Sequence, residues 1–188
     1  MKLVAISGSI VGSKTRIAVN YAVKKIREKY PKVEVEIVDL AQYDIQFSDG
    51  RNYLEYEGDT KLVVQTIMEA DAIIVGTPVF QASIPGALKN IFDLLPEGAF
   101  LNKVISILVT AGSEKHYLIV EQQLKPILSY MKAQVVDTYV FIEEKDFYRK
   151  EIINDDVLLR IQRLIEDTIV LLETYTKIRE EKEAEYGF

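Results

Sequence analysis

The stretch DAIIVGTPVFQASIPGALKNIFDLLP, residues 71–96, predicts the fold class of this chain. Its first part, residues 71–78, is apolar without alternation, which is typical of a strand covered on both faces. Its last part, residues 83–96, predicts a helix and carries Pro85 in the first turn, where proline is tolerated. A buried strand followed directly by a helix is the repeating unit of a parallel sheet.

Units of the same kind lie on both sides of this stretch. The predicted strands are residues 2–7, 33–40, 71–78, 103–111 and 134–142. The predicted helices are residues 15–30, 59–70, 83–96, 114–133 and 154–186. This alternation favours a flavodoxin-like three-layer α/β/α sandwich with a five-stranded parallel sheet in the order 2-1-3-4-5. With no internal repeat or linker, residues 1–188 are expected to form a single domain that binds one ligand.

Particular residues predict where some helices begin, bend or end, and how one long connection behaves. Asp59 is placed to cap the second helix, and Pro126 is placed to kink the fourth. Residues 41–58 are long for a connection inside a compact domain, so they are either functional or poorly ordered. The last helix, about residues 154–185, loses its apolar stripe in residues 177–186, which favours either fraying or contact with a partner subunit.

Composition excludes several classes of protein. The net charge of −6 argues against a nucleic-acid partner, and the absence of cysteine excludes disulfides, thiolate nucleophiles and iron–sulfur clusters. His116 is the only histidine, so the common multi-histidine zinc sites are excluded and no metal site is predicted. The longest apolar runs, such as residues 104–111, are too short to cross a bilayer. A strand rather than a signal segment is expected from residue 2 onward, because no charged lead precedes an apolar signal core. The predicted location is therefore the cytoplasm.

Three turn-rich loops are expected to meet on one rim of the sheet. In a parallel sheet with this strand order, ligands bind beyond the carboxyl ends of the strands, where the order reverses. That point lies between the first and third strands, which are followed by loops 7–15 and 77–86. Loop 110–115, after the fourth strand, lies next to them. The sequence therefore predicts one ligand site built from three loops.

The first loop is close to a nucleotide-triphosphate loop but departs from it. That motif, G-x-x-x-x-G-K-[ST], needs four residues between its glycines and a lysine directly after the second. Here only three residues separate Gly8 from Gly12, and Ser13 displaces Lys14. No acid ends the apolar strand 72–78 to hold magnesium, and the dinucleotide motif G-x-G-x-x-G is absent. Triphosphate hydrolysis is therefore the disfavoured alternative.

The same loop suits a terminal phosphate monoester. A helix start offers unpaired N–H groups and a partial positive charge, and Lys14 and Arg16 add charge locally. Hydroxyl donors are available from Ser7, Ser9, Ser13 and Thr15. The alternative, that Ser13 and Thr15 only cap the helix, accounts for one hydroxyl and leaves the others without a role.

The second and third loops suit the rest of a flat ligand. Pro78, Val79 and Phe80 would present a rigid turn and an aromatic ring at the rim, although Phe80 in the core is an open alternative. The polar edge of a ligand could bond to the backbone groups of the next three residues, Gln81, Ala82 and Ser83. In the third loop, Gly112 lets the backbone approach a ligand closely.

Taken together, the three loops resemble those of the NADPH-dependent FMN reductase family. Family members open with a strand and a G-S-x-x-x-S-x-[ST] loop, matched by Gly8, Ser9, Ser13 and Thr15. They carry a second motif like P-x-[YF]-x-x-S-x-P-G-x-L-K-N-x-x-D, matched by Pro78, Phe80, Ser83, Pro85, Gly86, Leu88, Lys89, Asn90 and Asp93. Residues 40–51 and 110–128 are also similar to family segments, so the resemblance covers residues 1–142.

The resemblance is greatest to flavin reductases that supply two-component monooxygenases. Some of those carry an inserted tyrosine in the fourth helix, and the corresponding position here is Gln122. That departure argues against a dedicated monooxygenase partner.

The resemblance implies FMN and NADPH as cofactors. It places the FMN phosphate at Ser9, Ser13, Lys14, Thr15 and Arg16, the flavin ring over residues 78–83, and its pyrimidine edge near Ala111, Gly112 and Ser113. NADPH would give hydride to FMN, which passes electrons to free flavin, a quinone, an azo compound or another acceptor. The resemblance also implies a homodimer or homotetramer with the flavin near a subunit boundary. A flavodoxin-like electron carrier without its own NADPH site is the alternative.

No catalytic acid or base is predicted, because the cofactor carries the chemistry and the protein binds and orients it. His116 is expected at the rim or as a capping residue, and Arg51 and Lys115 are candidates for the NADPH phosphate. Lys89 and Asp93, four apart on one helical face, predict a local ion pair, with a subunit contact as the alternative. The acidic segment 143–145 is interpreted as solvated charge.

Overall fold

The computed structural model describes residues 1–186, and its central feature is a parallel sheet. The strands β1 (Lys2–Ser7), β2 (Glu34–Asp39), β3 (Ala72–Pro78) and β4 (Val104–Ala111) lie in the order β2-β1-β3-β4. Two short strands, β5 (Gln134–Val135) and β6 (Val140–Glu143), pair in parallel with β4. The predicted order 2-1-3-4-5 is confirmed, and the doubly wound sheet explains why β3 and β4 are buried along their whole length.

The fifth strand is interrupted, where the sequence predicts one strand over residues 134–142. Val136 N–H still donates to the Ile105 carbonyl of β4 (2.8 Å), and residues 137–139 then leave the ladder and turn toward the segment that follows β4. There Lys125 Nζ donates to the carbonyl of Asp137 (3.0 Å), and the Tyr139 hydroxyl donates to the carbonyl of Tyr117 (2.8 Å). These contacts hold residues 137–139 at the edge of the sheet, where an interrupted strand also discourages pairing with another chain.

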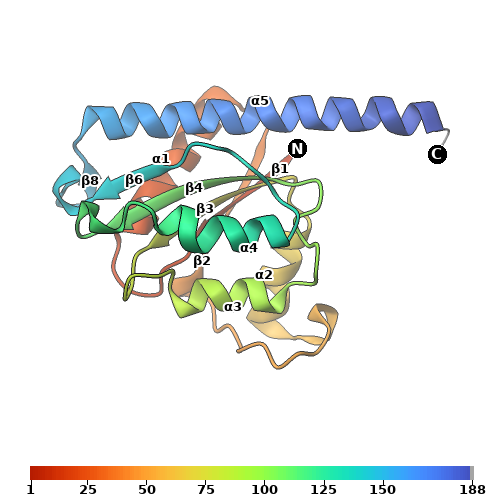
Figure 1. Cartoon of the computed structure of the whole chain (residues 1–188), viewed down its shortest axis with the longest axis horizontal. Coiled ribbons are helices and arrows are strands. Elements are labelled where there is room, and N and C mark those ends of the chain that lie inside the picture. The colour runs from red at the N-terminus through yellow and green to blue at the C-terminus, as the bar shows by residue number, and fades with distance from the viewer. Residues whose placement is uncertain (187–188) are drawn as a thin grey trace.

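Helices cover both faces of the sheet (Figure 1). The helices α1 (Lys14–Lys29) and α5 (Asp155–Tyr186) lie on one face, and α2 (Gly58–Met68), α3 (Gly86–Leu94) and α4 (Lys125–Tyr130) lie on the other. Because strand side chains alternate between faces, Leu3 packs beneath α1 whereas Val4 packs beneath α2 and α3. Two apolar cores, one on each face, hold the three layers together.

Two helices begin at other residues than the sequence predicts. The N-cap residue of α2 is Glu57, and the carboxylate of Asp59 accepts a hydrogen bond from the backbone of Asp44 instead (2.8 Å). Helix α3 begins at Gly86, with Pro85 as its N-cap residue, because the chain just before it is folded into a tight turn. Both differences arise from contacts with the neighbouring loops.

The predicted fourth helix, residues 114–133, is divided into three pieces. A 3-10 turn (Glu114–His116) and a π-helical segment (Val120–Leu124) precede α4. Pro126 lies in the first turn of α4, and since proline has no N–H it leaves the carbonyl of Gln122 without its ladder partner. Residues 125–130 are α-helical through Pro126, so the kink at Pro126 stays a prediction, and Gln122 lies inside the π-helical segment.

The long connection after β2 is held in place by side-chain contacts. The amide of Asn90, which is buried, donates to the carbonyl of Gln46 and accepts from the backbone of Ser48, both at 2.9 Å. Tyr56 is 1% exposed, and its hydroxyl donates to Asp49 (2.9 Å). Of the two readings of this connection, poor order is thus contradicted by a network of defined hydrogen bonds.

The C-terminal part of the chain adds a hairpin and a long helix. The antiparallel strands β7 (Phe147–Tyr148) and β8 (Glu151–Ile152) were not predicted. The 32-residue α5 packs against the sheet through buried residues as far as Leu172, and then extends past the sheet (Figure 1). It is helical to Tyr186, which gives no support to fraying, and contact with a partner subunit stays a prediction.

Within residues 1–186, every helix is either too short or too polar to cross a membrane.

Candidate functional site

Hydrogen bonds join the three loops at the carboxyl ends of the strands. Gly8 N–H donates to the carbonyl of Gly76 (2.8 Å), which ties the first loop to β3. Val79 N–H donates to the carbonyl of Thr110 (3.0 Å), and the hydroxyls of Thr15 and Thr110 share a hydrogen bond of 2.8 Å. The structure therefore brings together the loops that the sequence places on one rim.

The first loop approaches β3 so closely that only glycine fits at its start. A Cβ atom on Gly8 would lie 2.7 Å from the carbonyl oxygen of Gly76, and Gly12 has a φ of +77°, which favours glycine. Ser9 is nearly buried, and its hydroxyl donates to the carbonyl of Val11 (2.5 Å). The loop is thus fixed by close packing and by its own hydrogen bonds.

The start of α1 leaves donors open at this loop. Ser13 is the N-cap residue, yet its side chain makes no capping hydrogen bond, and the first intrahelical bond runs from Ile17 N–H to the Ser13 carbonyl. Thr15 is 3% exposed and uses its hydroxyl on Thr110 rather than on the helix. The capping interpretation of Ser13 and Thr15 is therefore wrong. The N–H groups of residues 14–16 have no intrahelical partner.

A buried hydroxyl lies under the same loop. Ser7, at the end of β1, is 1% exposed, and its Oγ has no hydrogen-bond partner among the described residues. Buried polar atoms almost always have a hydrogen-bond partner, so the unpaired Ser7 Oγ indicates that a polar group could bind beneath this loop.

Both positively charged side chains at this loop are paired with carboxylates. Lys14 Nζ donates to Glu144 Oε1 (2.5 Å), and this hydrogen bond lowers the pKa of Glu144. Arg16 Nη1 lies 3.4 Å from Oδ2 of Asp39, whose side chain is only 4% exposed. Neither carboxylate was predicted to be near the site, and residues 143–145 had been interpreted as solvated charge. Glu144 is 68% exposed, so it is a solvated charge as interpreted, and it also pairs with Lys14.

The second loop is a two-residue hairpin held in a strained conformation. Phe80 and Ser83 exchange two backbone hydrogen bonds of 2.9 Å each. Between them Gln81 (φ 48°) and Ala82 (φ 57°) adopt left-handed conformations, although neither is glycine. Such strain costs about 1–3 kcal/mol per residue and tends to occur at functional sites. The backbone of Ser83 is engaged within the hairpin, whereas the backbone groups of Gln81 and Ala82 have no hydrogen-bond partner within residues 1–186.

Phe80 lies at the surface rather than in the core. Its side chain is 38% exposed, so the alternative that places it in the core is wrong. Pro78 is buried at the end of β3, and Val79 is half-buried, which leaves Phe80 as the aromatic face of this loop.

The third loop is open. Ala111 is buried, Ser113 is half-buried, and a Cβ atom on Gly112 would meet no atom within 4 Å. An aromatic cluster borders this loop, with the Tyr117 ring 5.5 Å from the rings of both Tyr139 and Phe141.

Of the remaining candidates, Arg51 is engaged by a neighbouring carboxylate, whereas Lys115 and His116 lie in the turn after β4. Arg51 binds both oxygens of Asp49 and stacks over Tyr56 (5.1 Å), and its hydrogen bonds hold the pKa of Asp49 well below its usual range. Lys115 is exposed and His116 is half-buried in the 3-10 turn after β4. A role for Arg51 in binding NADPH would require it to leave Asp49.

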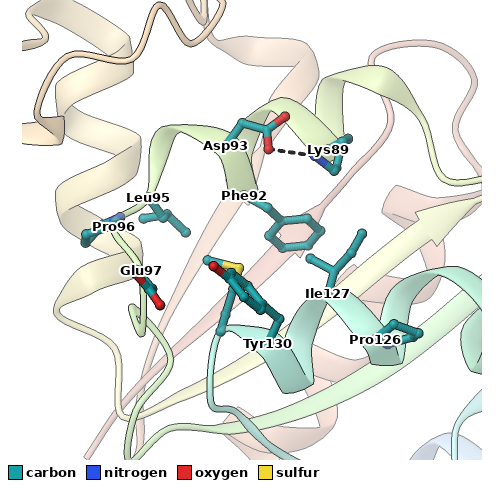
Figure 2. Close-up of a pocket in the computed structure, with 10 residues that line it drawn as sticks. Lys89, Phe92, Asp93, Leu95, Pro96, Glu97, Pro126, Ile127 and Tyr130 are labelled. Carbon is teal, nitrogen blue, oxygen red and sulfur yellow. Dashed lines mark hydrogen bonds and ion pairs between the residues drawn. The ribbon is translucent and has the colours of Figure 1, made fainter.

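A separate recess is lined by residues in and around α3 and α4 (Figure 2). It is about 500 Å³ in volume and lies between α3 and α4, with Phe92, Ile127 and Tyr130 among its lining residues. Lys89 Nζ and Asp93 Oδ1, 2.6 Å apart, form the predicted local ion pair at its edge. None of the three rim loops lines this recess, so it is not the candidate cofactor site.

Comparison with known proteins decides the family. The family model described as NADPH-dependent FMN reductase matches residues 1–147. The chain belongs to this family. A relative named NAD(P)H-dependent FAD/FMN reductase, from Geobacillus thermodenitrificans (strain NG80-2), is 39% identical over 165 residues, covering 87% of this chain and 89% of the relative.

A more distant relative and a solved structure also have the names of reductases that use NADPH or NADH. A protein named NADPH azoreductase, from Bacillus sp. (strain OY1-2), is 24% identical over 188 residues, covering 100% of this chain and 99% of the relative. A crystal structure of an NADH:FMN oxidoreductase in its apo form superposes with a TM-score of 0.74 and 26% identity, covering 89% of this chain and 87% of that one. FMN and NAD(P)H are the cofactors of the FMN reductase family, and the flavodoxin-like fold is confirmed.

Proposed function

We propose that the protein is an FMN-dependent NAD(P)H oxidoreductase whose electrons pass from NADPH through FMN to free flavin, a quinone, an azo compound or another acceptor. The observation that carries this proposal is the junction of three loops at one rim, linked through Thr110, in a chain of the FMN reductase family. FMN, when bound, supplies the hydride-accepting and hydride-donating chemistry, and the protein's part is to bind and orient it.

In this proposal the start of α1 holds the phosphate. Its unpaired N–H groups, the hydroxyl of Ser13 and the positive end of the helix dipole match a phosphate monoester, and Gly8 and Gly12 shape the turn around it. The orphan hydroxyl of Ser7 is a further donor beneath the loop. Ser9, Lys14, Thr15 and Arg16 complete the proposed set, although Ser9 and Thr15 each have an internal partner.

The second and third loops hold the ring in this proposal. Phe80 offers an apolar face, and the free backbone groups of Gln81 and Ala82 offer hydrogen bonds to a polar edge. Gly112 leaves space above Ala111 and Ser113 for the pyrimidine edge. The strained hairpin keeps these groups in place before the ligand arrives, so less ordering is required upon binding.

A titration and an activity assay test the proposal. Visible absorbance and flavin fluorescence should show that the purified protein carries or binds FMN, and its absence would reject the proposal. The FMN-loaded protein should then oxidise NADPH or NADH when offered a panel of flavins, quinones and azo compounds. Binding of FMN without steady NADPH oxidation would instead support the flavodoxin-like electron carrier.

We also propose that residues 1–188 form one FMN-binding domain and that the protein assembles as a homodimer or homotetramer. Light scattering of the FMN-loaded protein would measure its mass, and a monomer would contradict the second proposal. The cytoplasmic location stays a prediction.

A further inference from the structure

The two ends of α1 carry similar ion pairs with different surroundings. Lys14, its first residue, pairs with Glu144, and Lys29, its last residue, pairs with Glu166 of α5. At a rise of 1.5 Å per residue these lysines lie roughly 22 Å apart. Only Lys14 lies at the loop proposed to bind phosphate.

Glu144 is presented by a rigid turn. It begins a 3-10 turn (Glu144–Asp146) in which the buried carboxylate of Asp146 accepts from the backbone of Glu143 (2.8 Å). The other carboxylate oxygen of Asp146 accepts a hydrogen bond from Asn154 Nδ2 (2.7 Å). The backbone carbonyl of Asp146 accepts a hydrogen bond from Ile153 N–H (2.8 Å). The turn is thus anchored from both sides, so the Glu144 backbone has a fixed position beside α1.

The second cation of the loop is neutralised in the same way. Arg16 faces the buried carboxylate of Asp39 at the end of β2, on the other side of α1 from β6. A phosphate that arrives at the start of α1 therefore meets two cations that already have anionic partners. The donors without such competition are the backbone N–H groups and the Ser13 hydroxyl.

We propose that Glu144 sets the affinity of the loop for flavin phosphate by competing for Lys14. The proposal rests on the proposed function, because it assigns the phosphate of FMN to this loop. A dianionic phosphate has to draw Lys14 away from Glu144 and remain close to the Glu144 carboxylate. Both effects weaken binding of the phosphate and keep FMN exchangeable.

The expected effect is moderate because the pair is exposed. Side-chain exposures are 40% for Lys14 and 68% for Glu144, so solvent screens the interaction. Exposed ion pairs typically change an equilibrium by less than about fivefold, and salt weakens them further.

The test compares FMN with riboflavin, which has the same ring system but no phosphate. Glu144→Gln should lower the dissociation constant of FMN by about three- to fivefold and leave that of riboflavin unchanged. Glu144→Asp, which keeps the charge, should stay near wild type. Glu166→Gln removes the same charge at the far end of α1 and should affect neither ligand, since the distance exceeds the Debye length of about 8–10 Å.

The advantage of Glu144→Gln for FMN should shrink when the salt concentration rises from 50 to about 500 mM, as expected of a screened charge effect. Unchanged or weaker FMN binding by Glu144→Gln, or an equal gain for riboflavin, would overturn the role of Glu144 alone. Failure of the wild-type protein to bind FMN would overturn the proposed function as well.

Discussion

The phosphate loop (residues 8–13, with the start of α1) and the hairpin 80–83 are both rigid, but for different reasons. The loop is fixed by close packing of Gly8 against Gly76, without strain, and its donors face outward from a helix end. The hairpin is closed by two reciprocal hydrogen bonds and holds Gln81 and Ala82 in left-handed conformations. The loop is thus suited to recognise charge, and the hairpin to recognise a flat ring. Changes in the loop should therefore affect FMN alone, whereas changes in the hairpin should affect FMN and riboflavin alike.

The largest effect is expected from Ser13→Asp. A carboxylate at this position would repel the phosphate and should weaken FMN binding by about 100-fold, since like charges about 4 Å apart interact by several kcal/mol where water is partly excluded. Riboflavin binding should change little. Aspartate is a good N-cap residue, so the melting temperature should not fall. Ser13→Ala, which removes one donor without adding charge, is the matched control. If Ser13→Asp weakened the binding of FMN and of riboflavin equally, the assignment of the phosphate to this loop would be contradicted.

Gly8→Ala tests the packing of the loop. The new Cβ would lie 2.7 Å from the Gly76 carbonyl oxygen and 3.0 Å from a methyl of Leu88, so one of the two backbones has to shift. We expect a loss of about 2 kcal/mol in the free energy of unfolding, measured by urea denaturation. Gly86→Ala is the control, because a Cβ there meets no atom within 4 Å. Equal stabilities of the two variants would show that the loop is not closely packed.

Phe80→Ala tests the hairpin as a surface for the ring. Loss of the exposed aromatic side chain should weaken FMN and riboflavin by a similar factor, about tenfold, as expected for an aromatic contact. Tyr130→Ala is the control, since Tyr130 is 70% exposed and lines the recess between α3 and α4, to which none of the three loops contributes. If Phe80→Ala weakened the binding of FMN but not that of riboflavin, the hairpin would not be the surface that recognises the ring.

The smallest effect is expected from Ala82→Gly. Glycine adopts φ 57° without penalty, so relief of strain should raise the free energy of unfolding by about 0.5–1 kcal/mol after the added chain entropy is subtracted. Thermal unfolding would measure it, with Ala87→Gly in α3 as the control that should lose stability. A loss of stability in Ala82→Gly would mean that the hairpin is not strained at this residue.

The sequence was sufficient to predict the features of the fold that depend on local residue patterns. Unbroken apolar strands such as β3, each followed by a helix, were sufficient for the strand order and for the meeting of the three loops. The hairpin 80–83 could not be predicted because its central residues, Gln81 and Ala82, are not the Gly or Asn that usually mark such turns.

Long-range contacts account for the remaining differences. The break in the fifth strand depends on Tyr139 reaching Tyr117, 22 residues away, and the partner of Lys14 lies 130 residues along the chain. An isolated charge such as Glu144 carries no periodic signal, so only the folded arrangement shows that it lies at the loop. The position of Pro126 gives no signal for the π-helical segment that precedes it.

The most direct test of the account compares the affinities of the wild-type protein for FMN and riboflavin by fluorescence titration at two salt concentrations. If the start of α1 binds the phosphate, FMN should bind at least about tenfold more tightly at low salt, and this advantage should fall as salt screens the charges. Equal affinities at both salt concentrations would contradict the assignment of the phosphate to this loop.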